Sequence, residues 1–242
     1  MPAPLQAVVL AAGIGNRIAS ASNGLPKSYL PLAGETLLSR NLRLLRAIGV
    51  SNIIIVTGHQ HDRFAADFSA PDTHLVFNPF FQSSNVLVSF WCALPHLSSD
   101  FIYLHADTVF DPAILSNLAA APPATALLAA DRKTCAEEEM KYTLKPDGTV
   151  ALLNKTMPPA ESRGEFLGLA RFSAAALPIL RSGVHRVLAR GEFHSFFEAA
   201  LQEMINLGDL QPAIMDTGTL PWREIDFPED YEAARALFPD PS

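Results

Sequence analysis

The stretch "AVVLAAGIGNRIASASNGLPKSYLPLAG", residues 7–34, decides the fold. It begins with an apolar run that ends abruptly at Gly13 and Gly15, and Arg17 and Lys27 follow among small and polar residues. This pattern is typical of a buried strand that opens into a loop for an anion, because glycines let backbone N–H groups approach the ligand closely and fixed cations balance its charge. For the two glycines alone, an ordinary strand–loop–helix turn with two surface cations is an equal alternative.

The spacing within this stretch excludes two common nucleotide-binding loops. A dinucleotide fingerprint G-x-G-x-x-G needs a glycine three residues after Gly15, where Ile18 stands. A P-loop needs a Gly-Lys pair, which this stretch does not contain. The sequence therefore supports neither a Rossmann dehydrogenase nor a P-loop ATPase.

Composition limits the class of protein. The 242 residues are enough for one large α/β domain or two small ones, and we expect one. The chain is 49% hydrophobic and carries a net charge of −7, which disfavours both disorder and general nucleic-acid binding. No apolar stretch approaches the roughly 20 residues of a membrane span, and the first residues lack a basic signal-peptide region, so we expect no membrane insertion and a cytoplasmic location. The oligomeric state is left open.

Short apolar runs bounded by Gly, Pro, Asp or Asn predict strands at 6–12, 52–57, 74–77, 101–104 and 125–129. Leucines at near-helical spacing predict a helix between the first two strands, closed by Gly49. This βαβ unit implies a right-handed crossover and parallel strands. Two further helices are expected over 84–97 and from residue 111.

The second half is less regular. Residues 140–155 alternate around Pro146-Asp147-Gly148 and predict a β-hairpin. Residues 164–173 predict another strand, and helical stretches should follow as far as residue 209. The last segment, 219–238, predicts a short strand ending at Asp226, a turn at Pro228 and an amphipathic helix.

The pattern "VVLAAGIGNR…LPKSYLPL" resembles the signature L-A-A-G-x-G-[S/T]-R…P-K of nucleotidyltransferases with the nucleotide-diphospho-sugar transferase fold. The resemblance implies one Rossmann-like, three-layer α/β domain with a mixed, mostly parallel sheet over 1–242, with a nucleotide-binding half at about 1–110 and an acceptor-binding, metal-completing half at about 111–242. Asn16 departs from the usual Ser or Thr. The resemblance assigns Arg17 to the β- and γ-phosphates and Lys27 to the α-phosphate. The implied nucleotide contacts are Leu10, Ala11, Ala12, Gly13, Gly15, Asn16, Arg17, Lys27, Ser84, Asn85 and Ala106.

Carboxylates complete the expected site. Asp107 follows an apolar strand at its carboxyl end, where open α/β sheets bind ligands, although a helix N-cap is an equal alternative. Glu224 and Asp226 are two residues apart and so point to one face of the predicted strand, with an exposed sheet edge as the alternative. In the family that the sequence resembles, an acidic residue after the central strand and a late Asp hold Mg²⁺. Asp107 and Asp226 match these positions, and Glu224 is an additional candidate ligand.

Two segments narrow the resemblance. "VFNPFFQSSNVLVSFWCAL" and "IDFPEDYEAARALF" are similar to segments of phosphocholine and 2-aminoethylphosphonate cytidylyltransferases. This implies an Mg²⁺-dependent enzyme that transfers CMP from CTP to a small amino-alcohol phosphate or phosphonate. A sugar-1-phosphate or polyol-phosphate nucleotidyltransferase is the alternative enzyme. A non-catalytic nucleotide-binding regulatory protein is the alternative of another class, although it would be expected to have lost Lys27 or a carboxylate.

The acceptor site is the least defined. Phe193, His194 and Trp222 are candidates for a pocket that binds a cation, but the helical spacing of Phe193, Phe196 and Phe197 favours a core stripe. Lys141 and Glu165 resemble the part of these enzymes that covers the acceptor, and a solvated strand face is the favoured alternative for both. For Ser84 and Asn85, simple N-capping is as good an interpretation as nucleotide contact.

Overall fold

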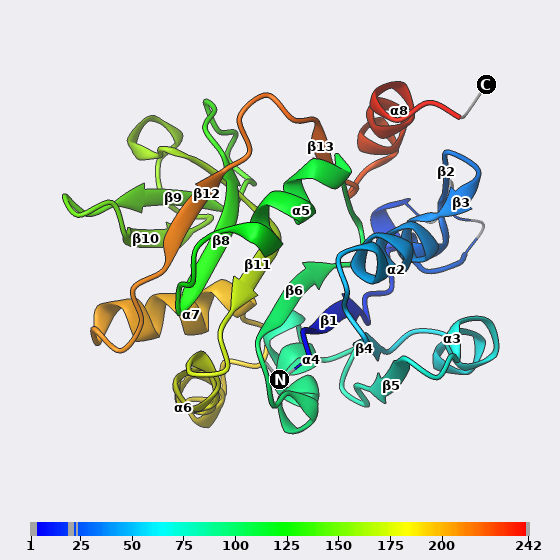
Figure 1. The fold of residues 1–242 in the computed structure, drawn as a ribbon, viewed down its shortest axis with the longest axis horizontal. Coiled ribbons are helices and arrows are strands. Elements are labelled where there is room, and N and C mark those ends of the chain that lie inside the picture. Colours follow the sequence, from blue (N-terminus) through cyan, green and yellow to red (C-terminus); the bar gives the residue numbers. More distant parts are fainter. Residues whose placement is uncertain (1–3, 19–21, 23, 241–242) are drawn as a thin grey trace.

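A nine-stranded sheet forms the centre of the computed structural model, which describes residues 4–18, 22 and 24–240 (Figure 1). Strand β1 (Gln6–Ala11) is buried along its whole length. It pairs in parallel with β4 (Asn52–Thr57) on one side and β6 (Phe101–His105) on the other. Strand β5 (Thr73–Phe77) continues the parallel arrangement beyond β4. The first half of the chain is therefore the parallel part of the sheet, as expected.

The second half extends the same sheet with antiparallel strands. Strand β11 (Gly164–Phe172) pairs antiparallel with β6 and with β8 (Ala126–Asp131). The predicted hairpin, β9 (Lys141–Leu144) and β10 (Val150–Asn154), follows, and β12 (Ala213–Asp216) runs parallel to β8. Because β11 joins both halves, the chain is a single α/β domain with a mixed sheet, which confirms the expected fold class.

Helices cover both faces of the sheet. Successive side chains of a strand point to opposite faces, so the apolar residues of β1 pack into two cores, one on each face. Ala7 and Val9 belong to the core with α2 (Leu37–Ala47), α3 (His61–Phe68) and α5 (Pro112–Ala120). Val8 and Leu10 belong to the other core, together with residues of α4 (Val86–Ala93), α6 (Ala176–Ala189) and α7 (Phe197–Asn206). The result is the expected three-layer arrangement. Among the described residues, no helix is long and apolar enough to cross a bilayer.

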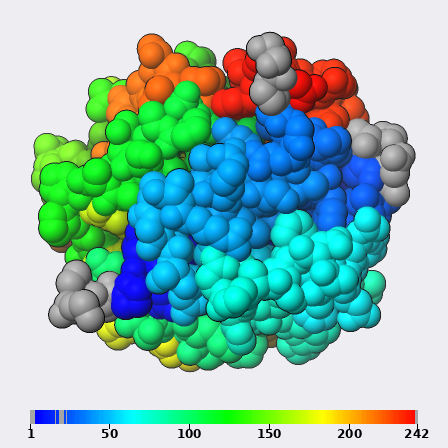
Figure 2. All heavy atoms as spheres, turned by 45° about the vertical axis from the view of Figure 1, so that its right-hand side comes forward, coloured from blue at the N-terminus to red at the C-terminus, as the bar shows by residue number. Residues whose placement is uncertain are grey.

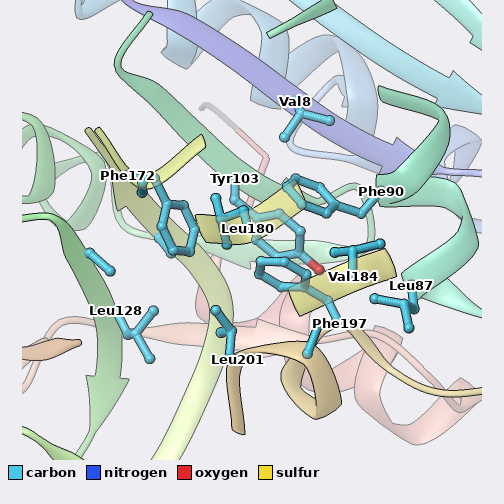
Figure 3. Packing of buried hydrophobic residues seen from close by; sticks show 14 of the residues in the cluster. Val8, Leu87, Phe90, Tyr103, Leu128, Phe172, Leu180, Val184, Phe197 and Leu201 are labelled. Carbon is cyan, nitrogen blue, oxygen red and sulfur yellow. The ribbon is translucent and has the colours of Figure 1, made fainter. Parts of the chain in front are cut away.

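The aromatic part of the second core anchors a residue of the site. Phe197 packs with ring-centroid distances of 4.4 Å to Phe90 and 4.5 Å to Tyr103 (Figure 3). All three residues are fully buried. The Tyr103 hydroxyl lies 2.7 Å from Nε2 of His105, so the packed core fixes the position of that imidazole at the end of β6.

The C-terminal segment returns to the N-terminal half. Strand β13 (Trp222–Glu224) pairs antiparallel with β7 (Thr108–Phe110), directly after β6. Helix α8 (Pro228–Leu237) follows, and the Tyr231 hydroxyl donates to the Pro31 carbonyl at 2.5 Å. Figure 2 shows α8 in red against the blue segment that contains Pro31. The short elements are η1 (Asn16–Ile18), η2 (Lys27–Tyr29), β2 (Pro31–Leu32), β3 (Glu35–Thr36), η3 (Leu94–His96) and η4 (Pro159–Glu161).

Several local predictions were wrong. The last strand ends at Glu224, so Asp226 lies in the loop before α8, and Pro228 begins that helix because its fixed φ suits the first helical turn. Phe193 and Phe196 are 49% and 38% exposed and precede α7, whereas only Phe197 enters the core. The Phe193 carbonyl accepts from the Asn85 N–H at 3.0 Å, which holds this segment outside the helix. The elements α3, β7 and β12 were not predicted.

Candidate active site

The loop after β1 lines a cavity of about 260 Å³. Gly15 has φ +73°, and a Cβ there would come within 2.9 Å of Lys27 Cγ. Glycine at this position therefore lets the Lys27 side chain lie against the loop. The cavity is lined by expected site residues together with Pro26 and Ser28, and the expected ones are Leu10, Ala11, Gly13, Gly15, Arg17, Lys27, Ala106, Asp107 and Asp226. The side chain of Asn16 lies outside the described residues.

Lys27 links two of the predicted carboxylates. Its Nζ forms an ion pair with Asp226 and lies 3.5 Å from Oδ2 of Asp107. The Lys27 side chain is only 16% exposed, whereas Arg17 is 61% exposed. The Arg17 guanidinium lies 3.9 Å from Asp226 Oδ2 and 5.3 Å from the ring centre of Phe227. One cation is thus buried in the cavity wall between two carboxylates, and the other is exposed to solvent.

Electrostatics keep this cluster charged. Burial acts to lower the pKa of Lys27, but Asp107 and Asp226 outweigh burial, and the pKa is raised. Burial also acts against ionised Asp226, yet Lys27 outweighs it and the Asp226 pKa is lowered. Burial raises the pKa of Asp107, and the neighbouring carboxylates add to this effect although Lys27 opposes it. The cavity therefore holds an ammonium next to at least one ionised carboxylate.

Backbone hydrogen bonds place Asp107 and Asp226 side by side. The Ala106 N–H donates to the Leu10 carbonyl at 3.1 Å, and the Ile225 N–H donates to the Asp107 carbonyl at 3.0 Å. The N-cap of α5 is Asp111, whose Oδ1 accepts from the Ala113 N–H, and this leaves the Asp107 side chain free for the cavity. Glu224 lies in β13, which pairs with β7, so it is not on the unpaired strand edge that was the alternative interpretation.

A second cluster shares Asp107 with the first. His105, Asp107 and Glu224 each offer one ligand atom, and these atoms lie within 4.8 Å of one another. His105 Nδ1 lies 3.7 Å from Glu224 Oε1, while Nε2 contacts Tyr103. Burial acts to lower the His105 pKa, but the nearby carboxylates of Glu224 and Glu198 raise it to about 9. The carboxylates of Asp107 and Glu224 in this cluster, and that of Asp226 beside Lys27, are the hard oxygen donors that Mg²⁺ prefers, so these residues would hold such an ion.

A bulge in β11 makes room for the imidazole. The pairing register of β11 with β8 shifts between Phe166 and Ala170. Gly168 lies in this interval with φ +72°, and a Cβ there would come within 2.6 Å of His105 Nδ1. A side chain at this position would displace the His105 ring, so Gly168 is part of the structure that positions the second cluster.

A second cavity of about 420 Å³ adjoins the first. The two share Leu10, Gly13, Arg17, Asp107 and Asp226 in their walls. Ala12, Ser84 and Asn85, three of the predicted nucleotide contacts, line the second cavity as well. Asn85 is also the N-cap of α4, where its Oδ1 accepts from the Val86 N–H at 2.8 Å. The capping role and the position in the cavity wall therefore occur together.

The five expected acceptor residues separate into two groups. Glu165 and Trp222 line a further cavity that shares Glu224 and Asp226 with the second one. Lys141, Phe193 and His194 lie elsewhere. The buried Lys141 amine donates to the carbonyls of Ala136, Glu137 and Glu139, Phe193 borders an apolar surface groove, and the His194 carbonyl accepts from the Asn85 amide.

The second cavity also contains residues that sequence reasoning missed, namely Asn78, His105, Glu138, Met140, Lys155, Phe166 and Glu198. Two of them carried a signal. His105 ends the strand two residues before Asp107, and Glu198 interrupts the apolar run "FFEAAL" in a predicted helix. A carboxylate on a core-facing helix surface is uncommon unless it has a partner or a function.

With this geometry described, the chain can be compared with known proteins. Residues 7–206 match the family described as the MobA-like NTP transferase domain. The chain belongs to this family. A curated member similar to it is CMP-5'-(3-aminopropyl)phosphonate synthase of Streptomyces rubellomurinus, 30% identical over 98% of this chain and 39% of that protein. Choline-phosphate cytidylyltransferase of Haemophilus influenzae is 32% identical over 44% of this chain and 46% of its own length. The matches span less than half the length of these relatives.

Solved structures of other NTP transferases share the fold. CTP:phosphocholine cytidylyltransferase from Streptococcus pneumoniae superimposes with a TM-score of 0.81 at 18% identity, covering 97% of this chain and 99% of that one. The inositol-1-phosphate CTP transferase from T. maritima gives 0.78 at 18% identity, covering 96% and 95%. At these identities the comparison shows the fold, and it agrees with the expected nucleotide-diphospho-sugar transferase arrangement.

Proposed function

We propose that this NTP transferase is an Mg²⁺-dependent cytidylyltransferase that transfers CMP from CTP to a small amine-bearing phosphate or phosphonate and releases pyrophosphate. The observation that carries the proposal is the Lys27 ammonium held between Asp107 and Asp226 in a cavity lined by the glycine loop. The names of the curated relatives, a CMP-phosphonate synthase and a choline-phosphate cytidylyltransferase, support the choice of CTP and of this acceptor class.

In this reaction an oxygen of the acceptor attacks the α-phosphorus of CTP. A new P–O bond forms, the bond from the α-phosphorus to the bridging oxygen breaks, and pyrophosphate leaves with that electron pair. Lys27, which is buried and charged, would stabilise negative charge on the α-phosphate. Arg17, which is exposed to solvent, contacts the β- and γ-phosphates. Positioning and charge neutralisation thus account for the catalysis, and no covalent intermediate with the protein is needed.

The carboxylates have a separate part. Asp107 and Asp226, with Glu224, would hold Mg²⁺, which neutralises phosphate oxygens when bound. Before substrate enters, Lys27 balances the charge of Asp107 and Asp226. Phosphate oxygens then compete with these carboxylates for the Lys27 ammonium.

Pyrophosphate release tests the proposal. CTP, UTP, ATP and GTP are each combined with 2-aminoethylphosphonate, phosphocholine, glycerol phosphate, inositol phosphate and a hexose 1-phosphate in the presence of Mg²⁺. We expect turnover with CTP and an amine-bearing acceptor, and loss of turnover when the metal is chelated. Turnover only with a sugar or polyol phosphate would overturn the acceptor class. Binding of CTP without turnover for any acceptor would favour a non-catalytic nucleotide-binding protein.

A further inference from the structure

Glu198 is a buried carboxylate that the proposed reaction does not use. It is the second residue of α7, it is 3% exposed, and it lines the second cavity. Its Oε2 has no hydrogen-bond partner among the residues that the structure describes. A buried carboxylate oxygen without a partner is costly, so such an atom in a cavity wall indicates a ligand that supplies a donor.

The other buried or half-buried carboxylates of this cavity have partners within the protein. Asp107 and Asp226 face Lys27, and Glu224 faces His105. The two nitrogens of His105 are directed to Glu224 and Tyr103. Glu198 lies near the charge of His105, but its Oε2 accepts no hydrogen bond from a described residue and so can accept one from a cation that enters from outside.

The cavity is poorly suited to a quaternary ammonium group, which is bound over several aromatic faces. Among the described lining residues, the aromatic ones are Phe81, Phe166 and Phe196. Phe166 is 3% exposed, and the Lys155 amine already lies 5.0 Å from the centre of the Phe196 ring. The Phe81 ring already contacts the rings of His59 and Phe77, with centroid distances of 6.4 Å to each, so the described lining residues do not form an aromatic cage.

We infer that Glu198 binds the cationic end of the acceptor, and that this end is an ammonium bearing N–H groups rather than a trimethylammonium. The inference rests on the proposed function and selects one class among its acceptors, the aminoalkyl phosphonates and phosphates. An N–H ammonium donates a charge-assisted hydrogen bond to Oε2, whereas a trimethylammonium has no donor and needs more space. Glu198 is thus a specificity-determining residue of the acceptor site.

The wild-type protein provides the first test, without any substitution. We measure kcat/KM with CTP for 2-aminoethylphosphonate and O-phosphoethanolamine, each beside its N,N,N-trimethyl derivative. We expect the amine to be preferred by about 30-fold or more in at least one pair, the size expected for one charge-assisted hydrogen bond. The pair with the higher kcat/KM shows whether the natural acceptor is a phosphonate or a phosphate. Equal or better use of both trimethyl compounds would overturn the inference while the proposed function stands.

Glu198→Gln provides the second test, with Glu203→Gln on the same helix as the matched control. Glu203 pairs with Arg190, outside the cavity. We expect E198Q to lower kcat/KM for the amine by about 30-fold. Its kcat/KM for the trimethyl analogue and its KM for CTP should change by less than about threefold. The E203Q control should have the kinetic constants of the wild type. Because burial of the Glu198 carboxylate outweighs its attraction to His105, removing its charge in E198Q should leave Tm equal or raise it. An unchanged preference in E198Q, or a lowered Tm with equal losses for all substrates, would make Glu198 a structural residue. No turnover with CTP and any acceptor would overturn the proposed function itself.

Discussion

The walls of the first and second cavities are built in different ways. The wall of the first comes largely from residues within 10–17 and 26–28, which are close in sequence, and is completed by Ala106, Asp107 and Asp226. The wall of the second combines the start of α4, the end of β6, the β11 bulge, the start of α7 and the loop after β13. Phosphate recognition needs only close backbone approach and fixed charge, which a single loop can provide. The shape of an acceptor pocket depends on elements that meet only in the folded chain.

Asp226→Asn tests the point at which both cavities meet, and it should have the largest effect. The substitution removes the charge that pairs with Lys27 and one proposed metal ligand. We expect kcat for pyrophosphate release to fall by about 10³-fold or more, roughly 4 kcal/mol of transition-state stabilisation. Asp209→Asn, which removes a surface pair with Arg186, serves as the control and should keep full activity. Near-normal turnover of the Asp226 variant would exclude this residue from the catalytic site.

Lys27→Met tests the first cavity by itself. Methionine keeps much of the side-chain length but removes the ammonium, so Asp107 and Asp226 lose their shared counter-charge. We expect kcat to fall by about 10²-fold, since one fixed charge next to the reacting phosphate is lost. Without the ammonium, the two carboxylates should also gain more stability from added Mg²⁺ than they do in the wild type. A thermal melt with and without Mg²⁺ measures this difference, and an equal Mg²⁺ effect on both proteins would count against these metal ligands.

The first cavity could be predicted from the sequence better than the second, because more of its residues are close together along the chain. Gly13, Gly15, Arg17 and Lys27 line one cavity, and their grouping was visible in the sequence because they lie close together along the chain. The parallel strands were predicted because their apolar runs are continuous. By contrast, β12 has half-buried residues without a strong pattern, and β7 has only three residues.

The cavity-lining role of Glu198 could not be deduced from spacing. Its position depends on how α7 packs against the aromatic core, in which Phe197 contacts Phe90 and Tyr103. Phe193 was a candidate because of helical spacing, and the segment that contains it is instead held by the Asn85 N–H. Tertiary hydrogen bonds of this kind leave no periodic trace in the sequence.

Gly168→Ala tests the second cluster through the backbone. The new Cβ would clash with the His105 ring, and the alanine would have to keep the positive φ of Gly168. We therefore expect a loss of about 3 kcal/mol in the free energy of unfolding. Gly208→Ala is the matched control, because Gly208 has a similar φ of +74° but open space around its Cα. The control should lose only about 1 kcal/mol. Urea denaturation of both variants measures the difference, and equal losses would show that the bulge is not needed to accommodate His105.

Glu165→Gln should have the smallest effect, and it concerns the cavity bordered by Glu165 and Trp222. Burial raises the pKa of Glu165 from the ordinary value of 4.5 to about 7, although Lys133 opposes the shift from 2.6 Å. A carboxyl group with a raised pKa in the folded state binds more protons there than in the unfolded state, so its contribution to stability is lost as pH rises from about 4.5 through 7. Between pH 5 and 8, the free energy of unfolding of Glu165→Gln should therefore fall by about 2 kcal/mol less than that of the wild type.

Lys133→Met gives the opposite sign and makes this last prediction specific. Removing the Lys133 ammonium leaves the Glu165 carboxylate with less compensation, so its pKa should rise further and the loss of stability should extend to higher pH. Urea denaturation at a series of pH values compares the two variants with the wild type. If both variants change the slope in the same direction, the titration in this window belongs to another group, and the Lys133–Glu165 pair does not set the charge of this cavity wall.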